Sequence, residues 1–189
     1  MTTVIPFRAG GKTRLPGELR QELALAMLGD VIEAALGLGD VRIVTSDEDG
    51  ARVARELGAT VVGDPGGGQG AAVVAALDGL SGACLVVNAD LPCATTDALA
   101  RLAGLGPALV AAADGTTNAL ALARPEAFVD LYGPGSAARF AAAGLTPVVV
   151  AELAYDVDTR DDLARLPLRT GRRTALVLDH HELLRPTAR

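Results

Sequence analysis

Short apolar segments alternate along this chain with longer amphipathic segments. The apolar segments predict strands at 4–7, 41–45, 60–62, 84–87, 108–112, 118–123 and 147–150. Helical spacing of apolar residues, with capping and breaking residues at the ends, predicts helices at 18–36, 47–57, 71–80, 96–103, 125–131, 136–143 and 158–166. The segment 84–87 has no polar position, as expected for a central parallel strand that helices cover on both faces. This order of elements predicts a doubly wound α/β fold.

The last part of the chain departs from this alternation. We place a single domain at residues 1–168 and a C-terminal tail at residues 169–189. The apolar run 174–178 follows two arginines and predicts an edge strand that could pair with another subunit. The two adjacent histidines after this run are interpreted as a solvated pair rather than a metal site. No function is assigned to the tail.

Composition and charge limit the classes of function. The chain is 50% apolar and 21% charged, as in a globular protein with a substantial core. Its net charge of -6 argues against nucleic-acid binding, which needs a basic face. A membrane-spanning helix needs a run of about eighteen apolar residues, which the chain lacks, so no membrane partner is expected. The absence of a signal-peptide pattern and of a cysteine framework favours a cytoplasmic location.

The only lysine of the chain, Lys12, lies with Arg8 and Arg14 in a loop directly after the first predicted strand. The loop also holds two glycines, which let backbone N–H groups approach a ligand closely. Three cations beside such a backbone suit the binding of phosphates. A solvated turn is the alternative interpretation of this loop taken alone.

Three aspartates are the candidate metal ligands. Asp90 follows the segment 84–87 after Asn88 and Ala89. Asp156 and Asp158 are two residues apart in an extended segment, so their side chains are expected on the same side. Carboxylates in these positions can hold a magnesium ion that bridges nucleotide phosphates. Turn or helix caps at Asp90 and Asp158 are the alternative interpretation.

Three polar loops complete the candidate site. Thr117 and Asn118 end a turn whose hydroxyl and amide groups can position an anion. The segment 132–136 ends in a serine that would begin a helix, and the free N–H groups of a helix start can bind an anion. A glycine-rich segment around Gln69 can present polar groups to the edge of a purine base. An ordinary turn, an ordinary N-cap and a flexible loop are the respective alternatives.

In this order, these segments resemble the guanylyltransferases of deazaflavin coenzyme F(420) biosynthesis. That family comprises 2-phospho-L-lactate guanylyltransferase and its actinobacterial counterpart, phosphoenolpyruvate guanylyltransferase. The resemblance spans roughly residues 3–167. Its segments are Ile5-Pro6-Phe7-Arg8, Lys12-Thr13-Arg14-Leu15, Ala89-Asp90-Leu91-Pro92, Thr117-Asn118-Ala119-Leu120, Tyr132-Gly133-Pro134-Gly135-Ser136 and Asp156-Val157-Asp158-Thr159. Thr116 stands where a second glycine is usual, and Gly68-Gln69-Gly70 follows the family's Gly-Leu-Asn stretch only loosely.

The resemblance implies a Rossmann-like nucleotidyltransferase fold, with a mixed, mostly parallel sheet and helices on both faces. It also implies magnesium-dependent transfer of GMP from GTP to phosphoenolpyruvate or 2-phospho-L-lactate, with release of pyrophosphate. The implied metal ligands are Asp90, Asp156 and Asp158, and the implied catalytic residues are Lys12, Arg14 and Asp90. The implied acceptor-binding residues are Arg8, Thr117, Asn118, Gly133, Gly135 and Ser136. The implied nucleotide-binding residues are Gly68, Gln69, Gly70 and Asn88.

Three alternatives stay open at the level of the sequence. The first is another nucleotidyltransferase of the same fold, such as a molybdopterin guanylyltransferase or a sugar-phosphate nucleotidyltransferase. The second is a nucleotide-binding module without catalysis, and the third is a degenerate family member whose tail binds a partner. No residue distinguishes phosphoenolpyruvate from phospholactate, although a composition typical of GC-rich actinobacterial genomes favours the former. A homo-oligomer is compatible with the sequence.

Overall fold

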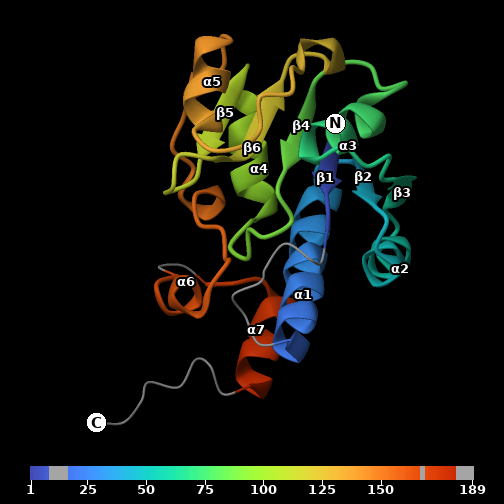
Figure 1. The fold of residues 1–189 in the computed structure, drawn as a ribbon, viewed down its shortest axis with the longest axis vertical. Coiled ribbons are helices and arrows are strands. Elements are labelled where there is room, and N and C mark those ends of the chain that lie inside the picture. Colours follow the sequence, from blue (N-terminus) through green and yellow to red (C-terminus); the bar gives the residue numbers. More distant parts are fainter. Residues whose placement is uncertain (9–16, 167–168, 182–189) are drawn as a thin grey trace.

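The computed structural model describes residues 1–8, 17–166 and 169–181, and these form one layered α/β unit around a central sheet (Figure 1). The strands are β1 (Thr2–Pro6), β2 (Asp40–Thr45), β3 (Thr60–Gly63), β4 (Cys84–Val87), β5 (Ala108–Ala111), β6 (Thr117–Leu122) and β7 (Thr146–Pro147). Their order in the sheet is β3-β2-β1-β4-β6-β5-β7. All pairs are parallel except those of β6, which runs antiparallel to both β4 and β5. The prediction of a mixed, mostly parallel sheet is therefore confirmed.

Helices cover both faces of the sheet, as predicted. The α-helices are α1 (Gly17–Leu36), α2 (Glu48–Glu56), α3 (Gln69–Leu77), α4 (Thr96–Gly104), α5 (Ser136–Ala142), α6 (Arg160–Ala164) and α7 (Arg172–His180). Two 3-10 turns, η2 (Pro125–Ala127) and η3 (Ala151–Leu153), lie in the connections. Helices α1, α2 and α4 pack on one core, and α3 and α5 pack on the other.

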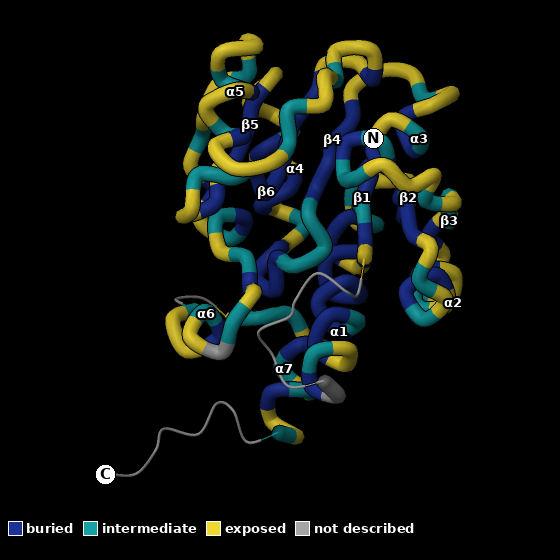
Figure 2. The backbone as a smooth tube through the Cα atoms, viewed as in Figure 1, coloured by how far each residue is buried: buried dark blue, intermediate teal, exposed yellow. Residues whose placement is uncertain are grey.

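Strand β4 lies between the two cores and is buried along its whole length (Figure 2). Leu85 and Val87 contribute to the core under α1, whereas Cys84 and Val86 contribute to the core under α3. This alternation follows from the two-residue period of a strand, and it explains why the segment has no polar position.

The structure corrects two predicted elements. The segment 125–131 forms only the 3-10 turn η2, after which Phe128 is extended and packs on the second core. The predicted edge strand 174–178 is instead part of helix α7, which packs alongside α1 (Figure 1). Thr174 and Leu178 are four residues apart and both buried, so they share the inner face of this helix.

Candidate active site

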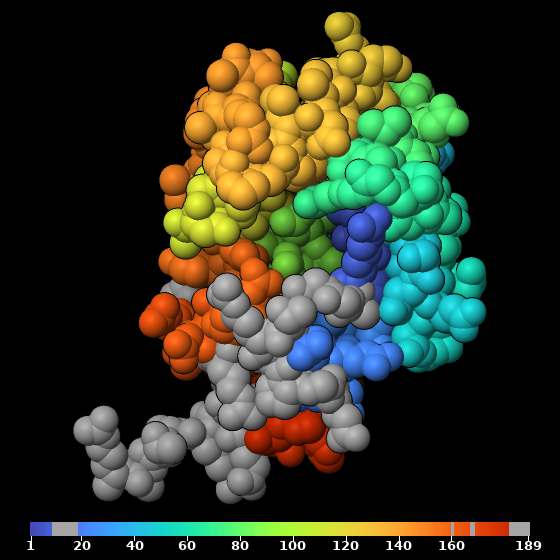
Figure 3. All heavy atoms as spheres, viewed as in Figure 1, coloured from blue at the N-terminus to red at the C-terminus, as the bar shows by residue number. Residues whose placement is uncertain are grey.

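A cavity of about 220 Å³ lies at the carboxyl ends of β1, β2, β3 and β4. In an open α/β sheet this is the edge where ligands bind. The polar residues that line the cavity are Arg8, Asp64, Gln69, Asn88 and Asp90. Figure 3 shows the surface hollowed over the green segment that follows β4, beside the blue N-terminal strand. Side chains from four strand ends therefore face one ligand-sized space.

Arg8 and Asp64 form an ion pair on one side of this cavity. The Arg8 Nε donates to Asp64 Oδ2 at 2.6 Å, and the Gly66 amide donates to Asp64 Oδ1 at 2.8 Å. The Asp64 side chain is 3% exposed, whereas that of Arg8 is 50% exposed. The hydrogen bond from Arg8 is the main cause that lowers the pKa of Asp64. This geometry fixes a guanidinium, with half of its surface open to solvent, at the rim of the cavity.

Asp64 is a site residue that the sequence reasoning missed. The signal was present, because Asp64 directly follows strand β3, and Asp90 likewise lies in the loop after its strand, β4. It was interpreted only as part of the loop formed by residues 64–68.

The residues predicted to bind the nucleotide meet around Asn88. The Gln69 Nε2 donates to Asn88 Oδ1 at 2.8 Å, and the Asn88 Nδ2 donates to the Thr117 carbonyl at 3.1 Å. Gly68 precedes α3 with a φ of 105°, a conformation that favours glycine. Gly70 lies against the Asp130 carboxylate so closely that a Cβ there would collide with it. The four predicted residues are thus brought together at the start of α3.

A second hydrogen-bonded cluster lies on the other side of Asn88. The hydroxyls of Thr117 and Ser136 share a hydrogen bond of 2.9 Å and are buried. The Ala137 amide donates to the Gly115 carbonyl at 3.2 Å, which joins the two loops that carry these hydroxyls. The structure therefore brings Thr117 and Ser136 together.

The loop before Ser136 is shaped by two glycines and by Arg139. Gly133 and Gly135 have φ values of 111° and 71°, in the region that favours glycine. The Arg139 guanidinium donates to the carbonyl of Pro134 at 2.6 Å and also to the carbonyls of Leu131 and Tyr132. This brace was not predicted, because its acceptors are backbone atoms that no side-chain pattern reveals.

Asp90 and Asp156 approach each other at the centre of the site. The Val157 amide donates to the Asp90 carbonyl at 3.1 Å, so the two segments are adjacent. Burial raises the pKa of Asp156, and the charge of Asp90 raises it further. The charge of Asp158 makes a smaller contribution in the same direction. Two like charges in a partly buried place favour the arrival of a cation.

Asn118 lies beside Asp156 and is 1% exposed. Its Nδ2 donates to the Leu153 carbonyl at 3.1 Å and to Asp156 Oδ1 at 3.4 Å. Its Oδ1 is buried and accepts no hydrogen bond from the residues that the structure describes. A buried acceptor without a donor is costly, so this oxygen is suited to a donor that arrives with a ligand.

The three predicted metal ligands do not form a closed cage. Among residues 1–8, 17–166 and 169–181, no three histidine, cysteine or acidic side chains are grouped so that they could hold a metal ion. Asp158 is exposed, and its amide donates to Asp162 Oδ2 at 3.1 Å. Lys12 and Arg14, predicted to contact phosphates, lie outside the described residues.

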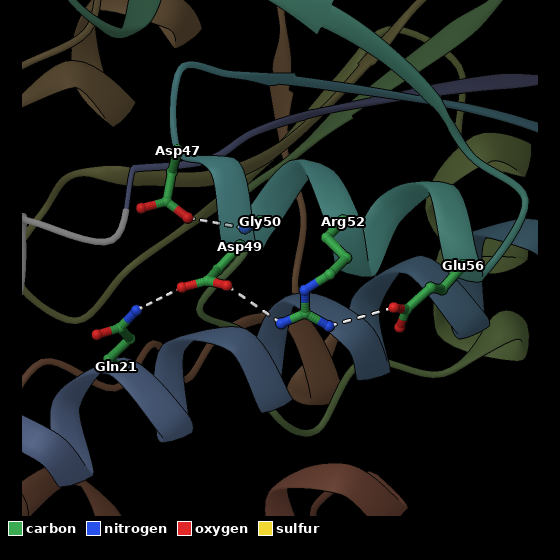
Figure 4. Close-up of polar contacts among 6 residues, drawn as sticks. All are labelled: Gln21, Asp47, Asp49, Gly50, Arg52 and Glu56. Atoms are coloured by element: carbon green, nitrogen blue, oxygen red, sulfur yellow. Dashed lines mark hydrogen bonds and ion pairs between the residues drawn. The ribbon is translucent and has the colours of Figure 1, made fainter.

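Charged side chains around α2 form a separate surface network (Figure 4). Asp47 accepts from the Gly50 amide at 2.7 Å and caps the helix, as predicted. Arg52 donates to Asp49 and to Glu56, both at 3.2 Å, and Asp49 also accepts from Gln21. These groups satisfy one another, so we attribute the network to the stability of α2 and not to ligand binding.

Comparisons with known proteins bear on the family and the fold of this chain. Residues 15–183 match the model of the MobA-like NTP transferase domain. A phosphoenolpyruvate guanylyltransferase from Thermomonospora curvata is 39% identical, over 91% of this chain and 86% of that protein. The chain belongs to the phosphoenolpyruvate guanylyltransferase family. Another member, from Mycobacterium marinum, is 36% identical over 90% of this chain and 88% of its own length. The family match extends through α7, into the segment that the sequence reasoning treated as a tail.

Solved structures confirm the fold of this family member. A nucleotidyl transferase from Methanothermobacter superposes with a TM-score of 0.63 at 15% identity, over 95% of this chain and 99% of that one. A CMP:2-keto-3-deoxy-manno-octonic acid synthetase in complex with CTP has a TM-score of 0.58 at 13% identity, over 94% and 98% of the two chains. The predicted nucleotidyltransferase fold is therefore confirmed. No helix in the described part of the chain is both long and apolar enough to cross a membrane.

Proposed function

We propose that this protein transfers GMP from GTP to the phosphate of phosphoenolpyruvate and releases pyrophosphate, a step of coenzyme F(420) biosynthesis in the cytoplasm. The proximity of Asp90 and Asp156 near two hydrogen-bonded clusters at the carboxyl edge of the sheet is the observation that carries the proposal. The relatives named phosphoenolpyruvate guanylyltransferase favour this acceptor over 2-phospho-L-lactate.

In this proposal, each of the two hydrogen-bonded clusters binds one of the two substrates. The cluster of Gly68, Gln69, Gly70 and Asn88 receives the nucleotide, next to the cavity and the start of α3. The Thr117 and Ser136 hydroxyls exchange their mutual hydrogen bond for bonds to the acceptor carboxylate, in the loop shaped by Gly133 and Gly135. Arg8 at the rim, with Lys12 and Arg14, offsets phosphate charge.

The reaction is a displacement at the α-phosphorus of GTP. An acceptor phosphate oxygen forms the new P–O bond while the bond to the β-phosphate oxygen breaks, and the electron pair leaves with pyrophosphate. The acceptor phosphate is already ionised at neutral pH, so the step needs no general base. Both histidines of the chain lie in the last ten residues, in agreement with this. The protein's task is alignment and charge compensation.

We propose Mg²⁺ as the cofactor, held by Asp90 and Asp156 with Asp158 nearby. The raised pKa of Asp156 and the unsatisfied Oδ1 of Asn118 fit a cation with bound water beside them. Magnesium usually binds through one or two carboxylates and completes its shell with water and substrate phosphates, so a cage of three protein ligands is not required. When bound, the ion supplies charge neutralisation between two highly anionic substrates.

The test is incubation of the purified protein with GTP, Mg²⁺ and each of phosphoenolpyruvate and 2-phospho-L-lactate. Mass spectrometry identifies the guanylylated product, and a coupled assay measures pyrophosphate. We expect product and equimolar pyrophosphate with phosphoenolpyruvate, and weaker turnover when ATP, CTP or UTP replaces GTP. Tight GTP binding without pyrophosphate release on either acceptor would contradict the proposal.

A further inference from the structure

We infer that helix α7 is a positioning element of the active site. It holds in place the two segments that carry Asp90 and Asp156. This inference rests on the proposed function and assigns a role to residues 172–180 within it. Figure 1 places α6 and α7 beyond the carboxyl ends of β1 and β4, and α7 packs along α1 between Glu22 and Glu33. The positioning residues are Asp30, Gly171, Val157 and Leu178, none of which needs to touch a substrate.

The first attachment is a buried cap. Asp30 of α1 is 4% exposed and accepts from the Arg173 amide at 2.9 Å and from the Thr174 amide at 2.8 Å. These amides belong to the first turn of α7, whose N–H groups have no partner within the helix. A Cβ at Gly171 would collide with the Asp30 carboxyl, and one at Gly29 would collide with the Arg173 side chain. The two glycines therefore let α7 approach α1 closely enough for Asp30 to cap it.

The second attachment leads to Asp90. The Gly171 amide donates to the Pro92 carbonyl at 2.7 Å. Pro92 is two residues beyond Asp90 in the same turn. The residue that must be glycine to fit against Asp30 thus also anchors the turn that carries the proposed catalytic carboxylate.

The third attachment leads to Asp156. Val157 is fully buried in a small core with Leu23 and Met27 of α1, Leu163 of α6 and Leu178 of α7. Neighbouring residues in an extended segment point to opposite sides, so an inward Val157 turns the carboxylates on either side of it outward together. The cluster fixes Val157, and its amide reaches the Asp90 carbonyl.

Such a support is needed because the site is electrostatically unfavourable by itself. The hydrogen bond from the Val157 amide to the Asp90 carbonyl brings two segments together that each carry a carboxylate, and like charges on adjacent segments repel each other. Without a fixed backbone the two segments would separate until a cation arrived. Helix α7 holds these two segments at the separation that the cation and the substrates require. This lowers the free-energy cost of ordering the segments when the cation and the substrates bind.

The test compares Asp30→Asn and Leu178→Ala with two matched controls in the full chain. Leu102→Ala makes the same truncation at an equally buried site in α4, in another core. Glu22→Gln removes the charge from an exposed contact with His181 at the same α1–α7 interface. Leu178→Met, which keeps the volume, is the rescue variant.

Hydrogen exchange of the metal-free protein is the first readout and does not depend on activity. We expect the amides of Val157 and Gly171 to exchange at least about tenfold faster than the sheet amides do, relative to wild type, in Asp30→Asn and Leu178→Ala. In both controls we expect no such selective increase at Val157 and Gly171, although Leu102→Ala loses stability in its own core. If exchange becomes faster by the same factor at all amides, and this factor is equal in Leu178→Ala and Leu102→Ala, the inference is overturned. A variant that does not fold is replaced by the smaller changes Leu178→Val and Asp30→Glu, for which the same local pattern is expected at smaller amplitude.

The second readout is the Mg²⁺ concentration that gives half of the maximal rate. We expect it to rise by about 10-fold to 100-fold in the two variants, the usual effect of removing groups that orient metal ligands, and to stay unchanged in the controls. Wild-type magnesium dependence in Asp30→Asn and Leu178→Ala would overturn the inference even if the enzyme is active. Absence of turnover in the wild type would instead refute the proposed function, and the exchange pattern alone would then decide the role of α7.

Discussion

The Val157 amide donates a hydrogen bond to the Asp90 carbonyl, and this contact aligns two aspartate-bearing segments that are distant in the chain. The first segment ends the central strand β4, and the second precedes α6. Each segment is supported by an independent contact, Gly171 to Pro92 for the first and the buried Val157 side chain for the second. The proximity of Asp90 and Asp156 is therefore a property of the packed fold and not of either loop alone.

Substitution of Asp90 by asparagine should remove activity and leave the fold intact. The amide keeps the size of the side chain but loses the charge that the proposed metal site needs, and a loss of kcat of at least about 10²–10³-fold is expected, as for other preorganised charged groups. Steady-state kinetics with saturating Mg²⁺ measures this. Asp40→Asn, at the exposed amino end of β2, is the matched control and should be unaffected. Wild-type kcat in Asp90→Asn would remove this carboxylate from the mechanism.

Substitution of Asp156 by asparagine should stabilise the metal-free protein. Burial and the neighbouring Asp90 charge raise the pKa of Asp156, so its ionised form is disfavoured in the folded state. A raised carboxyl pKa means that wild-type stability falls as the pH rises through this titration, and the variant avoids that fall. We expect a gain of about 1 kcal/mol at neutral pH, or roughly 2–4 °C in Tm, which vanishes under acidic conditions where Asp156 is protonated.

Thermal unfolding with and without Mg²⁺ provides the control for Asp156. The ion should raise the Tm of the wild type and not that of Asp156→Asn, since ligand binding stabilises only a protein that retains the site. An equal Mg²⁺ effect in both proteins would show that the ion binds elsewhere.

Replacement of Thr117 by valine should affect the acceptor more than the nucleotide. Valine keeps the shape of the side chain but leaves the buried Ser136 hydroxyl without its 2.9 Å partner and the acceptor without a donor. A hydrogen bond to a charged group contributes about 1.5–3 kcal/mol, so the KM for phosphoenolpyruvate should rise roughly 10-fold to 100-fold. The KM for GTP should change little. Equal increases in both KM values would indicate a general disturbance of β6 rather than a role in acceptor binding.

The sequence predicted the parts of the fold that depend on local periodicity. Strand β4 was found as 84–87 because all of its side chains are buried. Asp90 and Asp156 were proposed as site residues because each lies in a loop at the edge where ligands bind, and the structure brings their segments together. Helix α7 was missed because a run of five small and apolar residues fits a strand as well as a buried helix face. Its decisive cap, Asp30, lies in α1, far away in the sequence. A contact between residues so distant in the sequence follows from the packing of the whole fold, and the local pattern of apolar and polar residues does not reveal it.

Replacement of Arg8 by glutamine should lower the free energy of unfolding at neutral pH and raise the pKa of Asp64. The hydrogen bond and charge of Arg8 lower that pKa, so the pair contributes stability above the unfolded carboxyl pKa of about 4. That contribution is lost as the pH falls through the lowered pKa of the folded state. Because the Arg8 side chain is half exposed, we expect a loss of only about 1 kcal/mol at pH 7. Urea unfolding of Arg8→Gln, Asp64→Asn and the double variant at several pH values measures the coupling. If the single and double variants lose stability additively at pH 7, the ion pair contributes nothing to the fold and Arg8 is held at the rim by other contacts.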